Sequence, residues 1–364
     1  MLPGLTARDI TKELRRESRD IASRLASIHH DVEFVNNVAD AFYPLPLISN
    51  FRCGAWYTQP DRTAGASYFK STDGHIHHWQ FSLKRTNLHL IPIIQRNTKD
   101  NEPTGCIIVD STRRGKRFPD ALSKTIPIWC AVLNLASQKR YGSPADIPEL
   151  SCASSVSPSE YEQIKELIPG WTHALLDSDI EVPFLTRPLR PVFVYPPHIP
   201  PTDLGTTFHT IVLLCASDSE GVSLSPLKYV QGAGDDHENW ALGLTPELYW
   251  RHKRELFALL MDRVSLTSRV ENIVSQASRN RCLEWFSIGS RHDTQIFGTS
   301  IDVDVCLLRD IRKDEQHTLV VYCSQSEDSM PEGNRCIVLG ISPGKRGVAM
   351  FSERLPGVVV RVES

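Results

Sequence analysis

The chain has 364 residues, of which 41% are hydrophobic and 23% charged, and its formal net charge is −3. This length allows two or three packed units, and the composition is that of an ordinary globular protein. The slightly negative charge argues against a generally basic nucleic-acid binder, so any such role must rest on local basic patches.

Cysteine usage and apolar runs bear on the compartment. The nine cysteines include no C-x-x-C pair, and several lie in apolar runs, where cysteine packs as a small hydrophobe. This pattern argues against a disulfide framework and for a reducing compartment. The N-terminus does not read as a signal peptide, and no apolar run approaches the roughly 20 residues that span a bilayer. We therefore expect a cytoplasmic protein without a membrane segment.

The N-terminal segment predicts one long helix, or two in line, to about Ala41. Thr6 with Asp9 three residues later forms a capping signature, and apolar residues follow at helical spacing. The opposite face is basic, with acidic residues between the cations, and is read either as a solvated face or as a contact for RNA phosphates. Its cations are Lys12, Arg15, Arg16, Arg19 and Arg24.

A polar stretch, SYFKSTDGHIHHWQFSLKRTNLHLI, occupies residues 67–91. It predicts a strand end at Tyr68-Phe69 and then a turn. Three histidines, His75, His77 and His78, suggest zinc, but no second ligand cluster lies at a familiar spacing. A pocket that hydrogen-bonds a phosphorylated sugar fits the residue types better. Its candidate members are Lys70, Ser71, Thr72, Asp73, His75 and Arg85.

The central stretch, GCIIVDSTRRGKRFPDALSK, occupies residues 105–124. Cys106 to Val109 predict a short buried strand, which ends at Asp110, and helical spacing begins near Leu122. A strand, a basic glycine-containing loop and a helix can form an anion site, although a solvated basic turn is the alternative. Asp110 beside several cations favours a metal–phosphate ligand. The candidate anion-binding residues are Ser111, Thr112, Arg113, Arg114, Gly115, Lys116, Arg117 and Lys124.

The second half of the chain begins with a Ser/Pro-rich linker at 142–158. Ser157, Pro158 and Glu160 predict a helix start, and Gly170 predicts its end. Residues 192–195 read as extended and residues 211–215 as a buried strand.

A third stretch, LKYVQGAGDDHENWALGLTPELYW, occupies residues 227–250. Gly232 and Gly234 flank a turn next to Asp235 and Asp236, and this acidic loop is either solvated or shaped for a ligand. Thr245-Pro246 predicts a helix that runs to about residue 263.

The tail predicts four strands, at residues 301–308, 318–323, 336–339 and 358–362. No GxxxxGK[ST], GxGxxG or GxSxG motif occurs. Together the elements predict an α/β protein: a mixed sheet with flanking helices and a strand–anion loop–helix core unit, preceded by a long N-terminal helix and followed by a β-rich C-terminal section. We expect an N-terminal helical segment at 1–45, an α/β catalytic domain at 46–290 and the β-rich section at 291–364.

Three motifs carry a resemblance: KSTDGH with the residues that follow it to 87, CIIVDSTRRGKRFPDALSKTIPIWC at 106–130 and YVQGAGDDHENWALGLTP at 229–246. They resemble the signatures of the initiator tRNA 2′-O-ribosyl phosphate transferase family of fungi and plants, over most of the chain. The resemblance implies transfer of a 5-phosphoribosyl group from phosphoribosyl pyrophosphate to the 2′-hydroxyl of a T-stem adenosine in initiator methionine tRNA, which keeps that tRNA out of elongation. It also implies a C-terminal domain similar to dual-specificity phosphatases, most or all of which we expect to be absent from this sequence, which ends at Ser364, about where that domain should begin.

The resemblance implies roles for the candidate residues. Asp110, Asp235 and Asp236 are the expected catalytic residues, with Asp110 and Asp236 as Mg²⁺ ligands and Asp235 or Asp236 as the general base. Gln231 and Gly232 join the substrate-binding set. The expected partners are initiator methionine tRNA and phosphoribosyl pyrophosphate, with neither DNA nor membrane. Two alternatives remain: a phosphatase-like or phosphosugar-binding enzyme without an RNA substrate, and a non-catalytic tRNA-binding module.

Overall fold

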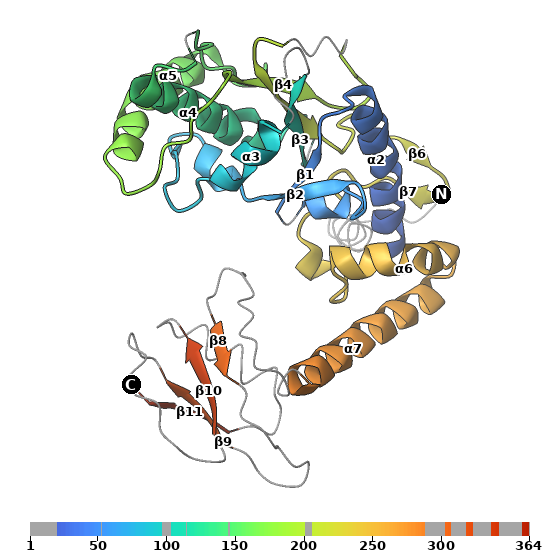
Figure 1. Cartoon of the computed structure of the whole chain (residues 1–364). Coiled ribbons are helices and arrows are strands. Elements are labelled where there is room, and N and C mark those ends of the chain that lie inside the picture. Colours follow the sequence, from blue (N-terminus) through green and yellow to red (C-terminus); the bar gives the residue numbers. More distant parts are fainter. Residues whose placement is uncertain are drawn as a thin grey trace. The chain divides into compact units, whose positions relative to one another are not determined.

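A computed structural model describes residues 20–51, 53–96, 103–113, 115–144, 146–200 and 206–287, and four strands between residues 303 and 363 (Figure 1). The chain divides into two compact units, Met1–Val274 and Ser275–Ser364. The predicted boundaries near residues 45 and 290 stay a prediction. Among the described residues, no helix is both long and apolar enough to cross a membrane.

A five-stranded sheet forms the centre of the first unit, and every neighbouring pair in it is parallel. All seven residues of each of the two central strands, β3 (Thr104–Asp110) and β5 (His209–Cys215), are buried, which is typical of a parallel sheet covered on both faces. The strand order is β2 (Thr63–Ser67), β1 (Leu47–Asn50), β3 (Thr104–Asp110), β5 (His209–Cys215) and β4 (Leu189–Val194).

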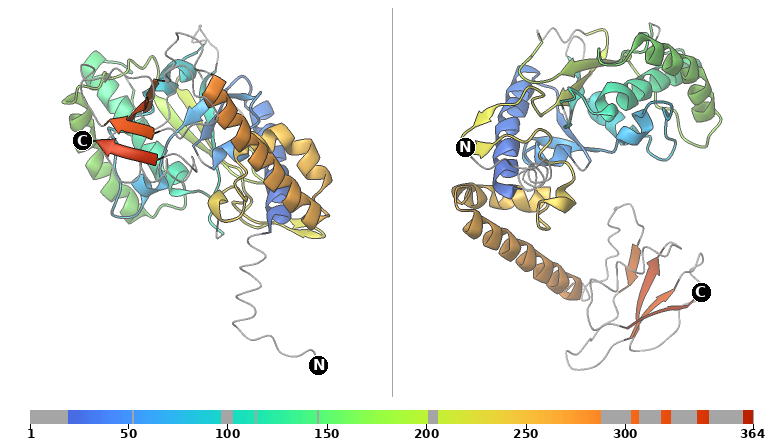
Figure 2. Two further views of the ribbon diagram at one scale, coloured as in Figure 1. Left: turned by 90° about the horizontal axis from the view of Figure 1, so that it is seen from below. Right: turned by 180° about the vertical axis from the view of Figure 1, so that it is seen from behind.

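Helices cover both faces of this sheet. Figure 1 shows α4 (Ile126–Tyr141) and α5 (Pro158–Leu176) on one side and α2 (Ile21–Ala41) on the other, and the view from behind in Figure 2 shows the same arrangement. Alternate strand residues, among them Ile108 and Leu213, join the core cluster with α4 and α5. The short α3 (Ile91–Ile94) packs next to β3.

The strand order creates a topological switch point. The chain runs from β1 to β2 on one side of β1, and it then returns to place β3 on the other side. The connections leave β1 and β3 in opposite directions, and the region beyond the carboxyl ends of two such strands, called the crevice below, is where open α/β sheets bind ligands. Asn50 and Asp110 are the last residues of these two strands.

The helix starts follow the expected capping chemistry. Ser157 Oγ accepts from the N–H of Glu160 at the start of α5, and Thr245 Oγ1 accepts from the N–H of Leu248 at the start of α6 (Pro246–Ala258). A π-helical segment, η4 (Ala121–Thr125), directly precedes α4 and forms the first turn of the central helix. The last helix of this region, α7, spans Arg263–Ser287.

The second unit contains a four-stranded sheet in the order β11 (Val359–Glu363), β9 (Thr318–Tyr322), β10 (Cys336–Ile341) and β8 (Val303–Cys306). Strand β10 is antiparallel to β8 and parallel to β9. All four strands predicted in the tail are therefore present.

The predicted α/β class, the long first helix and the strand–loop–helix unit are confirmed. The expected mixed sheet proves parallel throughout in the first unit, because helices and long loops connect its strands. The predicted end of α5 at Gly170 is wrong: the helix continues to Leu176, since Ile168, Thr172 and Leu175 keep its buried face in register. The helix from Thr245 is also shorter than expected and ends at Ala258. Residues 1–19 lie outside the described part.

Two glycines give a matched test of the packing. A Cβ on Gly105 in β3 would lie 1.9 Å from the carbonyl oxygen of Thr210, whereas a Cβ on Gly170 in α5 meets nothing within 4 Å. Gly105→Ala should therefore lower the free energy of unfolding by roughly 3 kcal/mol. Gly170→Ala should raise it by about 0.5–1 kcal/mol, because alanine favours a helix interior. Urea denaturation measures both, and equal effects would contradict the strand register.

Candidate functional site

A buried carboxylate marks the switch point. Asp110 Oδ2 accepts a hydrogen bond of 2.7 Å from Asn50 Nδ2, and Asp110 Oδ1 accepts one of 2.8 Å from the N–H of Ser111. Burial raises the pKa of Asp110 to about 7, against the lowering effect of these two donors, and the charge of Asp235 raises it further. Asp110 is thus a fixed carboxyl group that can change its charge near neutral pH.

Asn50 holds this carboxylate and was not recognised from the sequence. Its Nδ2 also donates to Phe69 O at 2.9 Å, and its Oδ1 accepts from Phe69 N at 2.9 Å and from Ser67 Oγ at 3.2 Å. One amide therefore connects the ends of β1, β2 and β3. The signal that could have found it is the polar pair Ser49-Asn50 after the apolar Leu47–Ile48 pair, at a strand end.

The anion loop after Asp110 is tied to the end of β5. The N–H of Thr112 donates to Ser217 Oγ at 3.3 Å, and Ser217 Oγ donates to Thr112 O at 2.9 Å. Ser217 is a second residue that the sequence did not reveal. These bonds fix the backbone of the loop at its first turn.

The third stretch closes onto the same loop. Gln231 Oε1 accepts from the N–H of Gly115 at 2.7 Å, and Gln231 Nε2 donates to Lys116 O at 2.8 Å. Gly232 has a φ of 66°, and a Cβ there would lie 2.5 Å from Thr112 O. Only glycine permits this approach without a shift of the backbone. The two stretches, joined by hydrogen bonds between residues 115 and 116 positions apart, thus form one structure.

Arg113 joins the anion loop to both aspartates of the third stretch. Its Nε lies 3.3 Å from Asp235 Oδ2, and its Nη1 pairs with Asp236. The hydrogen bond to Asp236 raises the pKa of Arg113. All three side chains are 39–46% exposed, so water screens these pairs and a bound anion can replace the carboxylates at low cost.

Arg24 supports the acidic loop from behind. Its Nη1 donates to Ala233 O at 2.8 Å and Asp235 O at 3.3 Å, and its guanidinium lies 5.3 Å from the centroid of the Trp240 ring. The interpretation of Arg24 as part of a solvated or RNA-contacting face is therefore wrong, because the side chain turns inward. The other predicted cations of that face lie outside the described residues.

The stretch with Lys70 to His75 packs against the start of the central helix. Ser71 Oγ accepts from the N–H of Ala121 at 3.3 Å, and Thr125 Oγ1 donates to Lys70 O at 3.0 Å. The side chain of Thr72 is exposed. This packing places the polar stretch beside the crevice.

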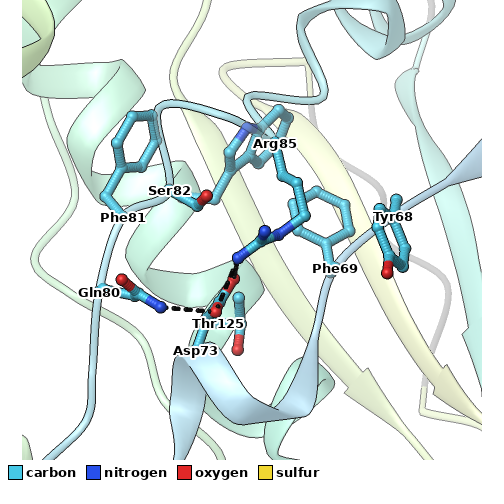
Figure 3. A pocket seen from close by; sticks show the side chains of 9 residues that line it. Tyr68, Phe69, Asp73, Gln80, Phe81, Ser82, Arg85 and Thr125 are labelled. Carbon is cyan, nitrogen blue, oxygen red and sulfur yellow. Dashed lines mark hydrogen bonds and ion pairs between the residues drawn. The ribbon is translucent and has the colours of Figure 1, made fainter. Parts of the chain in front are cut away.

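Asp73 and Arg85 hold each other in a small pocket (Figure 3). Arg85 Nη2 donates to both carboxylate oxygens of Asp73, at 2.8 and 3.0 Å, and Gln80 Nε2 donates to Asp73 Oδ1 at 2.7 Å. Aromatic rings line the rest of the pocket. They belong to Tyr68, Phe69, Phe81 and Trp129.

Asp120 is the centre of a second charged cluster. Lys124 Nζ lies 3.1 Å from Asp120 Oδ1 and 2.9 Å from Glu160 Oε1, and Lys124 is 7% exposed. Lys116 Nζ and His75 Nε2 approach Asp120 Oδ2 to 3.8 and 3.6 Å. The ammonium of Lys124 is therefore already matched by two carboxylates, whereas Lys116 and His75 remain more than half exposed.

Two remaining predicted residues are quickly placed. The Arg117 guanidinium lies 5.2 Å from the centroid of the Tyr195 ring, beyond the end of β4. Arg114 lies outside the residues that the structure describes. Across the described part of the chain, no group of three or more His, Cys, Asp or Glu side chains could hold a metal ion. The zinc interpretation of the three histidines therefore has no support.

Comparison with known proteins decides the family. A family model described as the Rit1 N-terminal domain matches residues 14–275. The chain belongs to this family. The resemblance of the three stretches is thereby confirmed, since all three lie within the matched residues. No solved structure matches the chain significantly.

Two curated relatives support the assignment to the Rit1 family. An uncharacterised protein of Schizosaccharomyces pombe, C3F10.06c, is 32% identical over 369 aligned residues, which cover 98% of this chain and 77% of that protein. The tRNA A64-2′-O-ribosylphosphate transferase of Saccharomyces cerevisiae is 35% identical over 316 aligned residues, which cover 76% of this chain and 59% of that protein. The chain thus matches somewhat more than half the length of the yeast transferase.

The raised pKa of Asp110 predicts a pH-dependent stability. The folded state holds this proton up to about pH 7, whereas an unfolded aspartate loses it near 3.8. Ionisation therefore favours the unfolded chain, and the free energy of unfolding should fall by roughly 4 kcal/mol between pH 4 and 7 from this group. Asp110→Asn should lack that component. Denaturation of both proteins at several pH values tests this, and parallel profiles would contradict it.

Proposed function

We propose that this chain transfers a 5-phosphoribosyl group from phosphoribosyl pyrophosphate to the 2′-hydroxyl of a T-stem adenosine in initiator methionine tRNA. The observation that carries the proposal is the fixed carboxylate of Asp110 at the switch point, followed at once by a cationic loop. The family membership and the printed name of the yeast relative support the same assignment. The site would act in the cytoplasm, where initiator tRNA is used.

The reaction exchanges one bond at the anomeric carbon for another. The bond from this carbon to the pyrophosphate oxygen breaks, the bond to the RNA 2′-oxygen forms, and the hydroxyl proton passes to a base. Positive charge develops on the ribose ring while a highly charged group departs, so electrostatic positioning provides most of the catalysis. The side chains of residues 111–117 would bind the phosphates, and arginine can do so bidentately.

Arg113 has a role that depends on its exposed ion pairs. In the structure it holds Asp235 and Asp236. A phosphate that binds Arg113 would take their place, because the pairs are screened by water. One of the two carboxylates would then be free to accept the proton of the attacking hydroxyl. Substrate binding and release of the base are thereby linked through one guanidinium.

Asp110 suits the ribose or a metal ion that accompanies the pyrophosphate. Magnesium in such sites takes one or two protein carboxylates and keeps several waters. The described residues offer no three-ligand group, which fits an ion shared with the substrate better than one bound by protein alone. Asp110 would be its main protein ligand and Asp236 a weaker second one, and the ion would neutralise the departing pyrophosphate.

Calorimetric titration with phosphoribosyl pyrophosphate, with and without Mg²⁺, and transfer of labelled ribose phosphate to initiator tRNA test the proposal together. Binding and transfer are expected. Hydrolysis of simple phosphoesters without tRNA binding would favour the phosphosugar-enzyme alternative. Binding of tRNA that ignores phosphoribosyl pyrophosphate would favour the non-catalytic module.

The three aspartates should separate into two classes. Asp110→Asn should impair binding of the Mg²⁺ complex of phosphoribosyl pyrophosphate, because the buried amide can no longer present a charge. Asp235→Asn and Asp236→Asn should bind it nearly normally, and at least one should slow transfer by about 10²–10⁴-fold, the usual contribution of a general base. Single-turnover transfer measures this. Full transfer by both loop variants would refute the assigned roles.

Arg113 should contribute to affinity without contributing to stability. Arg113→Ala is expected to weaken phosphoribosyl pyrophosphate binding by about 1.5–3 kcal/mol, the range for hydrogen bonds to charged groups. Lys165→Ala is the control, because Lys165 has the same 43% side-chain exposure and also pairs with a carboxylate, Glu149, on another surface. Calorimetry measures the affinity of both variants for phosphoribosyl pyrophosphate, and equal losses of affinity would place the anion site elsewhere.

A further inference from the structure

An exposed aromatic pair lies at the carboxyl edge of the sheet. Phe51 is 59% exposed, and its ring centroid lies 5.4 Å from that of the half-buried Tyr68, at an interplanar angle of 83°. The N–H of Phe51 donates to Ser67 O and so extends the pairing of β1 with β2. Single exposed apolar side chains are common, but two that form a fixed pair beside a candidate active site point to a ligand.

The pair is fixed to the candidate catalytic carboxylate by one side chain. Asn50, which donates to Asp110, directly precedes Phe51. The same amide binds both backbone groups of Phe69, the residue after Tyr68. The backbone on either side of the pair is therefore positioned by the group that positions Asp110. The rings and Asp110 therefore lie at the same edge of the sheet, at the ends of neighbouring strands.

The chemistry of this surface combines aromatic faces with a cation. Lys70 Nζ lies 5.4 Å from the centroid of the Tyr68 ring, and Tyr68 also lines the pocket that contains Asp73 and Arg85 (Figure 3). Proteins usually hold an unpaired nucleotide by stacking its base on an aromatic ring, while a nearby cation contacts its phosphate backbone. A protein partner with an apolar surface would gain nothing from the ammonium group of Lys70.

We propose that Phe51 and Tyr68 form a stacking platform for the base of the nucleotide whose 2′-hydroxyl reacts. This inference rests on the proposed transferase function. When the hydroxyl reaches Asp110 and the acidic loop, the base on the same ribose lies only a few bonds away. The perpendicular rings would let the base stack on one ring while its edge meets the other. A base that is flipped out of a stem loses its stacking on the neighbouring bases, and an aromatic ring of the protein replaces that stacking.

Affinity for initiator tRNA tests the platform in the full chain. Phe51→Ala and Tyr68→Ala should each weaken binding by about five- to a hundredfold, the range for loss of one stacked base. Binding of phosphoribosyl pyrophosphate should stay within about twofold, and the dependence of tRNA binding on salt should not change, because no charge is removed. Phe51→Tyr should bind nearly as well as the wild type.

Tyr43→Ala is the matched control. Tyr43 is 82% exposed and precedes β1, so it lies toward the amino edge of the sheet, opposite the crevice. If Phe51→Ala and Tyr68→Ala bind tRNA as well as Tyr43→Ala does, the platform is refuted. Normal tRNA binding and transfer with loss of a protein partner would also refute it. A wild-type chain that binds no tRNA would instead refute the proposed function.

A double-mutant cycle identifies the base. Initiator tRNA that lacks the base at the reacting nucleotide should bind the wild type more weakly, by at least the factor that Phe51→Ala causes. The Phe51→Ala variant should distinguish the two tRNAs less than the wild type does, because one of the two ring partners of the base is already lost. If the two factors by which affinity falls, one for the missing base and one for Phe51→Ala, simply multiply, the ring and this base do not interact, and the inference is overturned.

Discussion

The hydrogen bond between Asn50 and Asp110 is the interaction on which the rest of the site depends. A carboxylate at the bottom of a crevice loses most of its hydration, and its charge is tolerable only beside fixed donors. Asn50 is such a donor, and it also holds the backbone of Phe69. The amide therefore sets the distance between the ends of three parallel strands. The Asn50 amide thereby positions the residues that follow these strands, which are the anion loop after β3 and the aromatic pair after β1 and β2.

The charged groups around the crevice divide by burial. Lys124 is nearly buried between Asp120 and Glu160, and removal of one member of such a cluster usually costs about 3–5 kcal/mol. The exposed pairs of Arg113 are worth at most about 1 kcal/mol each. A substrate phosphate can therefore displace the partners of Arg113 but not those of Lys124. Of the predicted cations, Arg113 and Lys116 keep exposed side chains, whereas Lys124 stabilises the start of the central helix.

Local patterns in the sequence were sufficient for the elements and for part of the site. Apolar runs located the central strand and the four tail strands, and the sharp change of pattern at Asp110 located the anion loop. The residues that were missed act through partners far along the chain: Asn50 through Asp110, 60 positions away, and Ser217 through Thr112, 105 positions away. No periodicity or spacing records such a pair. Arg24 was misread for the same reason, since its partners are more than 200 positions distant.

The placement of Asp110 also explains why an acid with a pKa of about 7 suits this crevice. Without ligand, the group can hold a proton at little cost near neutral pH, so the empty crevice need not contain an uncompensated buried charge. Any ligand that brings positive charge lowers that pKa and selects the ionised form. The carboxylate is then fully charged only when its counter-charge is present. Because Asn50 and the N–H of Ser111 already point at its oxygens, this change of charge requires no movement of these donors.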